Sequence, residues 1–493
     1  MPATSPSSLV RFIKRFSQRS SSNSNSRTPR FTSIVTATTL ATQLFATLLL
    51  NGCAGLPYRR PEVPVPPAYR GDTTEHSTRQ NSLGTLAELR WQDLIHDEEL
   101  SKLIQEALSH NFDVQIAATR VLEARAQLTI SRSARLPALD AQAGYGNSRL
   151  LALDSSASSL SVSLGWELDL WGRIRNMSVA ARAELLASEQ ARRAVLQSLV
   201  SDVAGNYFLL RDLDLELEIT RHALKFREDF LALVQLRVDN GYSSEIDLRE
   251  AQVLVESAHT AVTSLELQIE QTENQLDVLL GRNPAAIVRG RSLLEQGLSS
   301  DLPAGLPSAL LERRPDILQA EQQLIANHAL VAVAKAAYFP VLCLTSSSGF
   351  ESSALHDLFS GSGAVWSIGP AASLPLFHAG SIRAGVRSAE AIQQQALLLY
   401  EQTVQEAFRE VADALVTRRK LAELRIEQEG LVESLSAAVE LADLRYRGGV
   451  ASYLEYLDSE RQLLDAQILL VQIRREELAN IITLYRSLGG GWQ

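Results

Sequence analysis

Most of the chain carries apolar residues at helical spacing. From Leu397 the apolar positions follow at steps of three and four: Tyr400, Val404, Phe408, Val411 and Leu415, and then Leu424, Leu431, Leu435, Val439 and Ala442. This spacing places them on one face of an α-helix. No proline falls within residues 138–283 or 376–493, so the sequence permits helices of unusual length.

The helical pattern is organised as two long hairpins. The first long helix is expected over about residues 172–238, which at 1.5 Å per residue would be near 100 Å. A turn containing Gly241 ends it, and a second helix returns toward Gly281. The later part of the chain repeats this arrangement, with a turn at Gly449 and a return toward Gly489.

Two other stretches alternate between apolar residues and small or polar ones. Their apolar members are Leu160, Val162, Leu164, Trp166, Leu168 and Leu170, and then Trp366, Ile368, Pro370, Ala372, Leu374 and Leu376. Weaker strand candidates precede them at residues 138–148 and 341–350, and polar tips at 154–159 and 360–363 join each pair into a hairpin. The length of about ten residues fits a tilted strand that crosses a bilayer. A soluble hairpin with one wet face is the alternative.

The chain is a tandem duplication. An offset of 208 relates residues of the two halves over about 110 residues: Gly172 to Gly380, Arg175 to Arg383, Val203-Ala204 to Val411-Ala412, Leu236-Arg237 to Leu444-Arg445, Gly241 to Gly449, and Leu280-Gly281 to Leu488-Gly489. Earlier in each half the offset is 203, as between Pro137 and Pro340. Each half is therefore one structural unit, consisting of a helix, a β-hairpin and a long helical hairpin.

The N-terminal residues have the order of charge and hydropathy that is typical of an export signal. Residues 1–52 hold six basic residues and no acidic one, with an apolar run from about Phe31 to Leu50. The run ends in Leu50-Asn51-Gly52-Cys53, which resembles the bacterial lipobox. Cys53 is therefore the expected site of lipid attachment, with acyl chains such as palmitate anchoring the chain in a membrane. A structural cysteine after an ordinary signal peptide is the alternative.

Charge and motif content exclude several function classes. Without the export signal the chain has 41 basic and 57 acidic residues, a net charge of about −16, which disfavours nucleic-acid binding. The eight histidines are scattered without metal-ligand spacing. No His-Glu-x-x-His, paired cysteines, Gly-x-Ser-x-Gly or phosphate-binding glycine loop occurs. Neither enzymatic activity nor a metal or other cofactor is expected.

The small number of strands predicts an assembly. Four strands do not close a transmembrane barrel, and an open sheet edge in lipid leaves backbone groups unpaired at a cost of several kcal/mol each. Two copies would give eight strands and a plugged interior, whereas three give twelve and leave room for a lumen. The expected fold class is mainly α with transmembrane β, a homotrimeric 12-stranded β-barrel continued by an α-helical barrel.

These patterns divide the chain into successive segments. We expect a signal peptide (1–52), a lipid-anchored N-terminal segment (53–96), repeat 1 (97–281, with its β-hairpin at about 138–171 and its long helical hairpin at 172–281), a linker that forms an equatorial belt (282–311), repeat 2 (312–489, with its β-hairpin at about 341–377 and its long helical hairpin at 378–489), and a C-terminal tail (490–493).

Short motifs along nearly the whole mature chain carry a resemblance to a known family. They are Cys53 with Pro57-Tyr58-Arg59-Arg60-Pro61, Trp91 with the helix through Leu108 and Asn111, Trp166-Glu167-Leu168-Asp169-Leu170-Trp171-Gly172-Arg173, Arg313-Arg314-Pro315-Asp316-Ile317, Ala407-Phe408-Arg409-Glu410-Val411-Ala412-Asp413, and Gly489-Gly490-Gly491-Trp492. Collectively they resemble the TolC and OprM outer-membrane factors, and most of all the NodT-like lipoproteins that work with resistance-nodulation-division pumps. The resemblance implies a lipid-anchored channel-tunnel of the outer membrane that extends into the periplasm. It also implies export of drugs or other small toxic compounds, with a periplasmic adaptor and an inner-membrane pump as partners.

The same resemblance places the closed end of the tunnel at the two helical turns. The matching residues are Leu454 and Asp458 at the constriction, Glu455 and its repeat mate Asp247 at a second acidic position, and Tyr446, which ties the turns together. Ala451 stands where some family members have arginine, so no salt bridge is expected there. Threefold symmetry would bring three Asp458 carboxylates around one axis, where they would attract cations and make closure sensitive to protonation. The alternative is that Asp458 is a solvated residue near a helix N-terminus.

Two other functions remain open at this point. The chain could be the outer-membrane outlet of a type I protein secretion system, which would keep the channel and change the cargo. It could also be a periplasmic coiled-coil adaptor lipoprotein, although adaptors have no use for membrane-crossing strands.

Overall fold

A computed structural model describes residues 58–67, 69–70, 86, 89–150, 153–297 and 307–491. The chain divides into two compact units, Met1–Ala54 and Gly55–Gln493, and all described residues belong to the second. The expected signal peptide and Cys53 therefore lie outside the described residues. No helix among the described residues combines the length and the hydropathy that crossing a membrane requires.

The described elements are mostly helical. The helices are α3 (Trp91–Leu94), α4 (Glu98–His110), α5 (Phe112–Ser133), α6 (Arg173–Asp239), α7 (Glu245–Leu280), α8 (Pro307–Arg313), α9 (Pro315–Ala336), α10 (Ser381–Arg447) and α11 (Tyr453–Ser487), with short 3-10 helices at Leu293–Glu295, Leu355–Asp357 and Gly361–Gly363. The strands are β1 (Ala138–Leu150), β2 (Leu153–Leu168), β3 (Val341–Ser352) and β4 (Ala364–Ser373). The expectation of a mainly helical chain with a few strands is confirmed.

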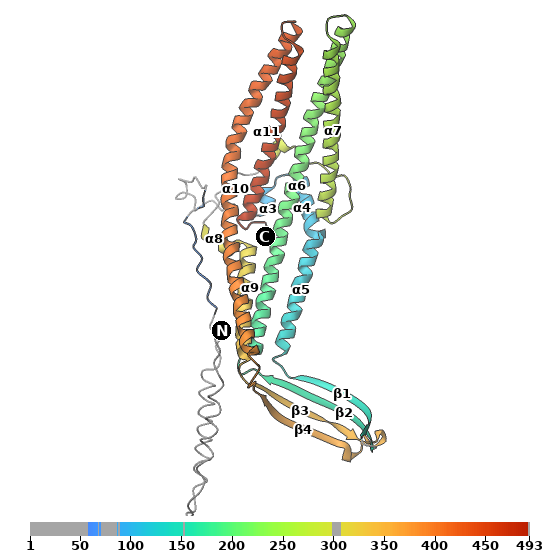
Figure 1. Ribbon diagram of the computed structural model, residues 1–493, viewed down its shortest axis with the longest axis vertical. Coiled ribbons are helices and arrows are strands. Elements are labelled where there is room, and N and C mark those ends of the chain that lie inside the picture. The colour runs from blue at the N-terminus through green and yellow to red at the C-terminus, as the bar shows by residue number, and fades with distance from the viewer. Residues whose placement is uncertain are drawn as a thin grey trace, which may run out of the picture. The chain divides into compact units, whose positions relative to one another are not determined.

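The element lengths repeat between the two halves. Helices α5 and α9 each have 22 residues, α6 and α10 each have 67, and α7 and α11 have 36 and 35. At 1.5 Å per residue, α6 and α10 are each about 100 Å long. In the unit formed by residues 55–493, the strands lie at one end of these helices and the turns α6–α7 and α10–α11 at the other (Figure 1).

The four strands form one antiparallel sheet in the order β1-β2-β3-β4. Partners directly opposite in such a ladder project to the same face. One face carries mostly apolar residues, in the registered sets Leu139, Leu164, Ser346 and Ile368, and Ala141, Val162, Ser348 and Trp366. The other carries small and polar residues, as in the set Asp140, Ser163, Ser347 and Ser367. The sheet is thus two-faced, with its β1 and β4 edges unpaired among the described residues.

Three details of the hairpins differ from the sequence predictions. Residues 154–159 were expected to form a turn, but they belong to β2, where they pair with β1 residues 144–149. The alternating pattern predicted strand up to Leu170 and Leu376, whereas β2 ends at Leu168 and β4 at Ser373. In both hairpins the apolar alternation thus continues beyond the last paired residue of the strand.

The core runs along α6. Tyr207, Phe208 and Leu210 are completely buried, and α6 contacts α4, α5, α7, α9 and α11. The predicted stripe on α10 is covered in its first part, because Val404 and Val411 are fully buried. Its second part is not covered within the single chain, where Leu424 and Leu431 are 42% and 47% exposed.

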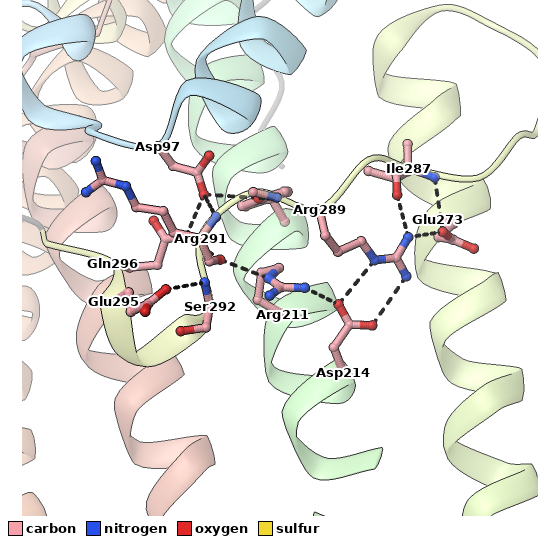
Figure 2. Close-up of polar contacts among 12 residues, drawn as sticks. Asp97, Arg211, Asp214, Glu273, Ile287, Arg289, Arg291, Ser292, Glu295 and Gln296 are labelled. Atoms are coloured by element: carbon pink, nitrogen blue, oxygen red, sulfur yellow. Dashed lines mark hydrogen bonds and ion pairs between the residues drawn. The ribbon is translucent and has the colours of Figure 1, made fainter. Parts of the chain in front are cut away.

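The segment after α7 is fastened to three helices by a polar network (Figure 2). Asp97 is buried at the start of α4, where it accepts hydrogen bonds from the backbone amide of Arg291 at 2.9 Å, from Gln296 Nε2 at 2.7 Å and from the Tyr207 hydroxyl at 3.1 Å. Burial pushes the pKa of Asp97 upward, but these bonds and those from the first amides of α4 outweigh it and hold the pKa below the usual range. Asp97 therefore remains ionised and fixes this segment.

Arg289 extends the network to the two helices of the first hairpin. Its guanidinium contacts Asp214 of α6 at 3.2 Å and forms an ion pair with Glu273 of α7. Arg211 joins the same cluster through Asp214 at 2.6 Å and the Arg291 carbonyl at 3.0 Å (Figure 2). One arginine thus ties the segment to both helices partway along their length.

Candidate functional site

The two helical turns have the same backbone hydrogen bonds. After α6, the amide of Tyr242 donates to the carbonyl of Arg237 at 2.8 Å. After α10, the amide of Val450 donates to the carbonyl of Arg445 at 3.0 Å, which is the same bond shifted by 208 residues. The duplication therefore extends to the geometry of the turns. The candidate site is built on these turns and the first residues of α7 and α11.

An aromatic cluster joins the two hairpins near the turns. Tyr446 of α10 packs on Phe230 of α6 with ring centroids 5.3 Å apart, and Phe230 stacks on Tyr456 of α11 at 5.6 Å. The Arg237 guanidinium lies 4.6 Å from the centre of the Tyr446 ring, a cation–π contact. Tyr446, Phe230 and Tyr456 are all buried, together with Val234, Leu248, Ala251 and Ala442. The structure thus places Tyr446 at the joint between the hairpins.

An ion pair lies beside this cluster. Arg227 Nη2 of α6 and Glu460 Oε2 of α11 are 3.0 Å apart, and their side chains are only 10% and 12% exposed. Removing one partner of so buried a pair leaves an uncompensated charge, at a cost of about 3–5 kcal/mol. The sequence interpretation missed this pair, because two residues 233 positions apart carry no local signal.

Leu454 and Asp458 lie one turn apart on α11. Leu454 is 67% exposed and lines an apolar groove with Ile246, Val253 and Leu457, so the groove is formed by α7 and α11. Asp458 is exposed and accepts hydrogen bonds from Arg461 Nη2 at 2.9 Å and from Gln462 Nε2 at 2.6 Å. Within the single chain, the Arg461 guanidinium and then the Gln462 amide hold the pKa of Asp458 below its usual range.

Glu455 and Asp247 both occupy the third position of their helices. Ser244 caps α7, and its hydroxyl accepts from the Asp247 amide while the Asp247 carboxylate accepts from the Ser244 amide at 2.9 Å. Ser452 caps α11 in one direction only, because its hydroxyl accepts from the Glu455 amide and receives no bond in return. The carboxylate of Glu455 instead lies 3.5 Å from Arg445 of α10. Both acids therefore stabilise the turns.

The sequence carries a local signal for these capping roles. Serine three residues before an acid is the pattern of a capping box, and it occurs at both helix starts. The hydrogen bond from the Ser244 backbone amide lowers the pKa of Asp247 most, followed by those with the hydroxyls of Ser243 and Ser244. Together they hold this pKa below its usual range. The carboxylate therefore stays ionised at neutral pH, as its cap requires.

Comparison with known proteins agrees with this architecture. The family model described as outer membrane efflux protein matches residues 103–282 and 306–490, most of the chain. The solvent efflux pump outer membrane protein SrpC of Pseudomonas putida is 38% identical over 460 residues, covering 91% of this chain and 97% of that protein. The cation efflux system protein CusC of Escherichia coli K12 is 35% identical over 453 residues, covering 90% and 97%.

Solved structures agree as well. A crystal structure of CusC superimposes with a TM-score of 0.79 at 34% identity, covering 88% of this chain and 99% of that one. The open state of the Neisseria gonorrhoeae MtrE outer membrane channel gives 0.80 at 33% identity, covering 89% and 98%. A small two-faced sheet continued by paired long helices is thus the fold of outer-membrane channels.

The chain belongs to the outer membrane efflux protein family. It works at the outer membrane and extends into the periplasm, and the predicted family, function and location are confirmed. The family assignment also excludes the alternative of a periplasmic adaptor.

Proposed function

We propose that three copies of this chain form one channel-tunnel, the outer component of a tripartite efflux system. The observation that carries this proposal is the sheet, which has an apolar face, a polar face and two unpaired edges, β1 and β4. Pairing the β4 edge of one copy with the β1 edge of the next satisfies both edges. Three sheets of four strands then give a barrel of twelve, with the apolar face toward lipid and the serine-rich face toward the lumen.

The helices support the same assembly. On α5, one side leaves large apolar residues exposed, among them Phe112, Ile116, Leu122 and Ile130. On α10, Leu398, Leu399, Leu424, Leu431, Leu441 and Leu444 are exposed. Apolar rows of this length on a long helix are typical of surfaces that a neighbouring helix covers. Neighbouring copies would cover them and continue the barrel as an α-helical cylinder.

A lipid on Cys53 would anchor each copy. The described chain begins five residues later, where Tyr58 packs edge-on against His328 of α9 at 6.0 Å. Arg60 then forms an ion pair with Glu321 at 2.9 Å and donates to the Leu311 carbonyl at 3.1 Å. The first described residues of the N-terminal segment are thus fastened to α9.

We infer the cargo and the partners of this channel from the similar proteins. The similar proteins are named for the efflux of solvents, toluene, antibiotics and cations. We propose small toxic compounds of this kind as cargo, with a periplasmic adaptor and a resistance-nodulation-division pump in the inner membrane as partners. The type I secretion alternative has no specific observation in its favour.

The gate of this channel is assigned to Leu454 and Asp458. Both are exposed on the same face of α11 just after the turn, where threefold symmetry would bring three copies of each to the axis. Three carboxylates around one axis favour cations. Arg461 stabilises the ionised form of each Asp458, so we expect protonation to affect the gate only in the acid range.

Single-channel recordings in planar bilayers test the gate. Replacing Asp458 and Glu455 by Ala should raise the conductance severalfold and weaken cation preference, because the carboxylates and their contacts at the constriction are lost. The control is Glu256→Ala, since Glu256 is an exposed acid of α7 that does not line the groove beside Leu454. The gate assignment is wrong if the double variant conducts like the wild type, or if Glu256→Ala has the same effect.

A further inference from the structure

Helices α6 and α11 meet along an antiparallel seam that joins the first hairpin to the second. At one end, Gln197 Nε2 donates to the carbonyls of Arg486 at 2.6 Å and Gly490 at 2.7 Å. At the other end lies the ion pair of Arg227 and Glu460. Polar contacts therefore recur along the seam, and each connects α6 with α11 or with the residues that follow it.

Asp212 lies in the middle of this seam, and its contacts are incomplete. The residue is only 3% exposed. Its Oδ2 is 3.1 Å from Arg475 Nε of α11, but the Nε–H bond does not point at this oxygen, so the contact is an ion pair without a hydrogen bond. Its Oδ1 accepts no hydrogen bond from the described residues. An ionised carboxylate in such a place lacks the bonds that normally offset its desolvation.

The charges around Asp212 do not compensate for this. Glu216 lies one turn further along α6 and is also buried, with its Oε1 accepting from Gln472 Nε2 at 2.8 Å. From α11, Glu476 faces the same site and lies 3.4 Å from Arg475 Nη2. The single guanidinium of Arg475 is therefore shared between two carboxylates, Asp212 and Glu476, and Glu216 adds a further negative charge beside Asp212.

A neutral carboxylic acid suits this environment better than a carboxylate. Burial raises the pKa of Asp212 to about 7, and Glu216 acts in the same direction, while Arg475 opposes them. The repeat mate of Asp212 in α10 is Lys420, so the acid belongs to the first repeat alone. The contact between α6 and α11 thus contains a buried acid whose pKa lies in the physiological range.

We propose that Asp212 is a proton-binding site in the α6–α11 seam, and that its protonation tightens the joint between the two helical hairpins when the periplasm becomes acidic. The ligand is the proton itself, delivered by water, and no other cofactor is required. This inference does not depend on the identity of the gate residues.

The sign of the effect follows from linkage. The pKa of Asp212 is higher in the folded protein than the ordinary aspartate value of 3.8. Its contribution to stability is therefore fully present below about pH 3.8 and is lost as the pH rises through about 7. The contact between α6 and α11 should therefore be most stable in acid and least stable above neutral pH.

Hydrogen exchange of the α11 backbone amides tests the proposal. The mature protein in detergent micelles is compared at pH 5.5 and pH 8, and each rate is divided by the intrinsic rate of an unfolded peptide at that pH. In the wild type, protection of residues 468–480 should be on the order of tenfold higher at the lower pH. In Asp212→Asn, which imitates the protonated acid, protection should be the same at both values and equal to that of the wild type in acid.

Two further variants keep the test decisive. Glu218→Gln changes an exposed acid of α6 and should retain the wild-type pH dependence. Arg475→Gln removes the charge that lowers the pKa of Asp212, so the midpoint of the transition should move upward by about 1 pH unit. The proposal is overturned if wild-type protection does not change with pH, if Asp212→Asn keeps the dependence, or if Arg475→Gln shifts the midpoint downward.

Discussion

The first long helix of each repeat has the same length but a different environment. Helix α6 contacts α4, α5, α7, α9 and α11, and its distal half buries Leu217, Phe230 and Val234. Helix α10 contacts α8, α9 and α11, and it meets α6 through Tyr446 and Phe230. Its distal half buries Tyr446 but leaves Leu424, Leu431, Leu441 and Leu444 exposed. The two copies of the long helix thus differ: α6 is packed against five other helices, and α10 leaves apolar surface uncovered in the single chain.

The second helices of the hairpins differ in a similar way. Helix α7 begins with a reciprocal cap, and the segment that follows it in the chain is held by Arg289 and Asp97. Helix α11 begins with a one-way cap, leaves Leu454 exposed and contacts α6 through a seam that includes the incompletely bonded Asp212. The first hairpin is thus the more firmly fixed of the two. The gate that we propose lies on this second hairpin.

The largest expected change in stability tests the difference in burial between α6 and α10. Leu210 is completely buried in α6, so Leu210→Ala should lower the free energy of unfolding by about 2–5 kcal/mol. Leu431→Ala, on the exposed side of α10, should leave the folded chain nearly unchanged and instead lower the temperature at which copies separate. Circular dichroism during heating reports the first effect, and gel mobility of unboiled samples the second. The contrast between the helices fails if the two variants behave alike.

A smaller difference in stability is expected between the glycines that end the two helical hairpins. Gly281 and its repeat mate Gly489 have φ values of 73° and 88°, where alanine costs about 1–2 kcal/mol. A Cβ on Gly281 would also lie 2.4 Å from the His110 carbonyl oxygen, whereas one on Gly489 would lie 3.1 Å from the Arg313 carbonyl carbon. Gly281→Ala should therefore lower the melting temperature more than Gly489→Ala does.

A helical glycine supplies the control for this pair. Gly430 lies inside α10, and a Cβ there would meet no atom within 4 Å. Gly430→Ala should be neutral or stabilising, because alanine is the better helix former. Equal losses for Gly281→Ala and Gly489→Ala would mean that the first hairpin is no more firmly fixed at this end than the second.

Periodicity was enough to predict the helices, the strands and the duplication. It reports which face of an element is apolar, and the 208-residue offset aligns two copies of the same pattern. It does not report where pairing stops. The polar residues 154–159 look like a turn but continue β2, because backbone pairing with β1 does not depend on their side chains.

Pairs of distant residues could not be predicted. Asp212 with Arg475, Arg227 with Glu460, and Asp97 with the Arg291 amide join positions whose separation no local pattern records. Leu454, Asp458 and Tyr446 were located by resemblance to a family. The structure adds their surroundings: Tyr446 is buried between the hairpins, and Asp458 is paired with Arg461.

The central claim is that one chain cannot close its own sheet and completes it with two copies of itself. Native mass spectrometry of the purified mature protein, released from mild detergent, tests this most directly. We predict a dominant species of three times the mass of the mature lipidated chain. A single-chain mass under conditions that preserve the helical content, or a stable assembly of another number of chains, would contradict the account.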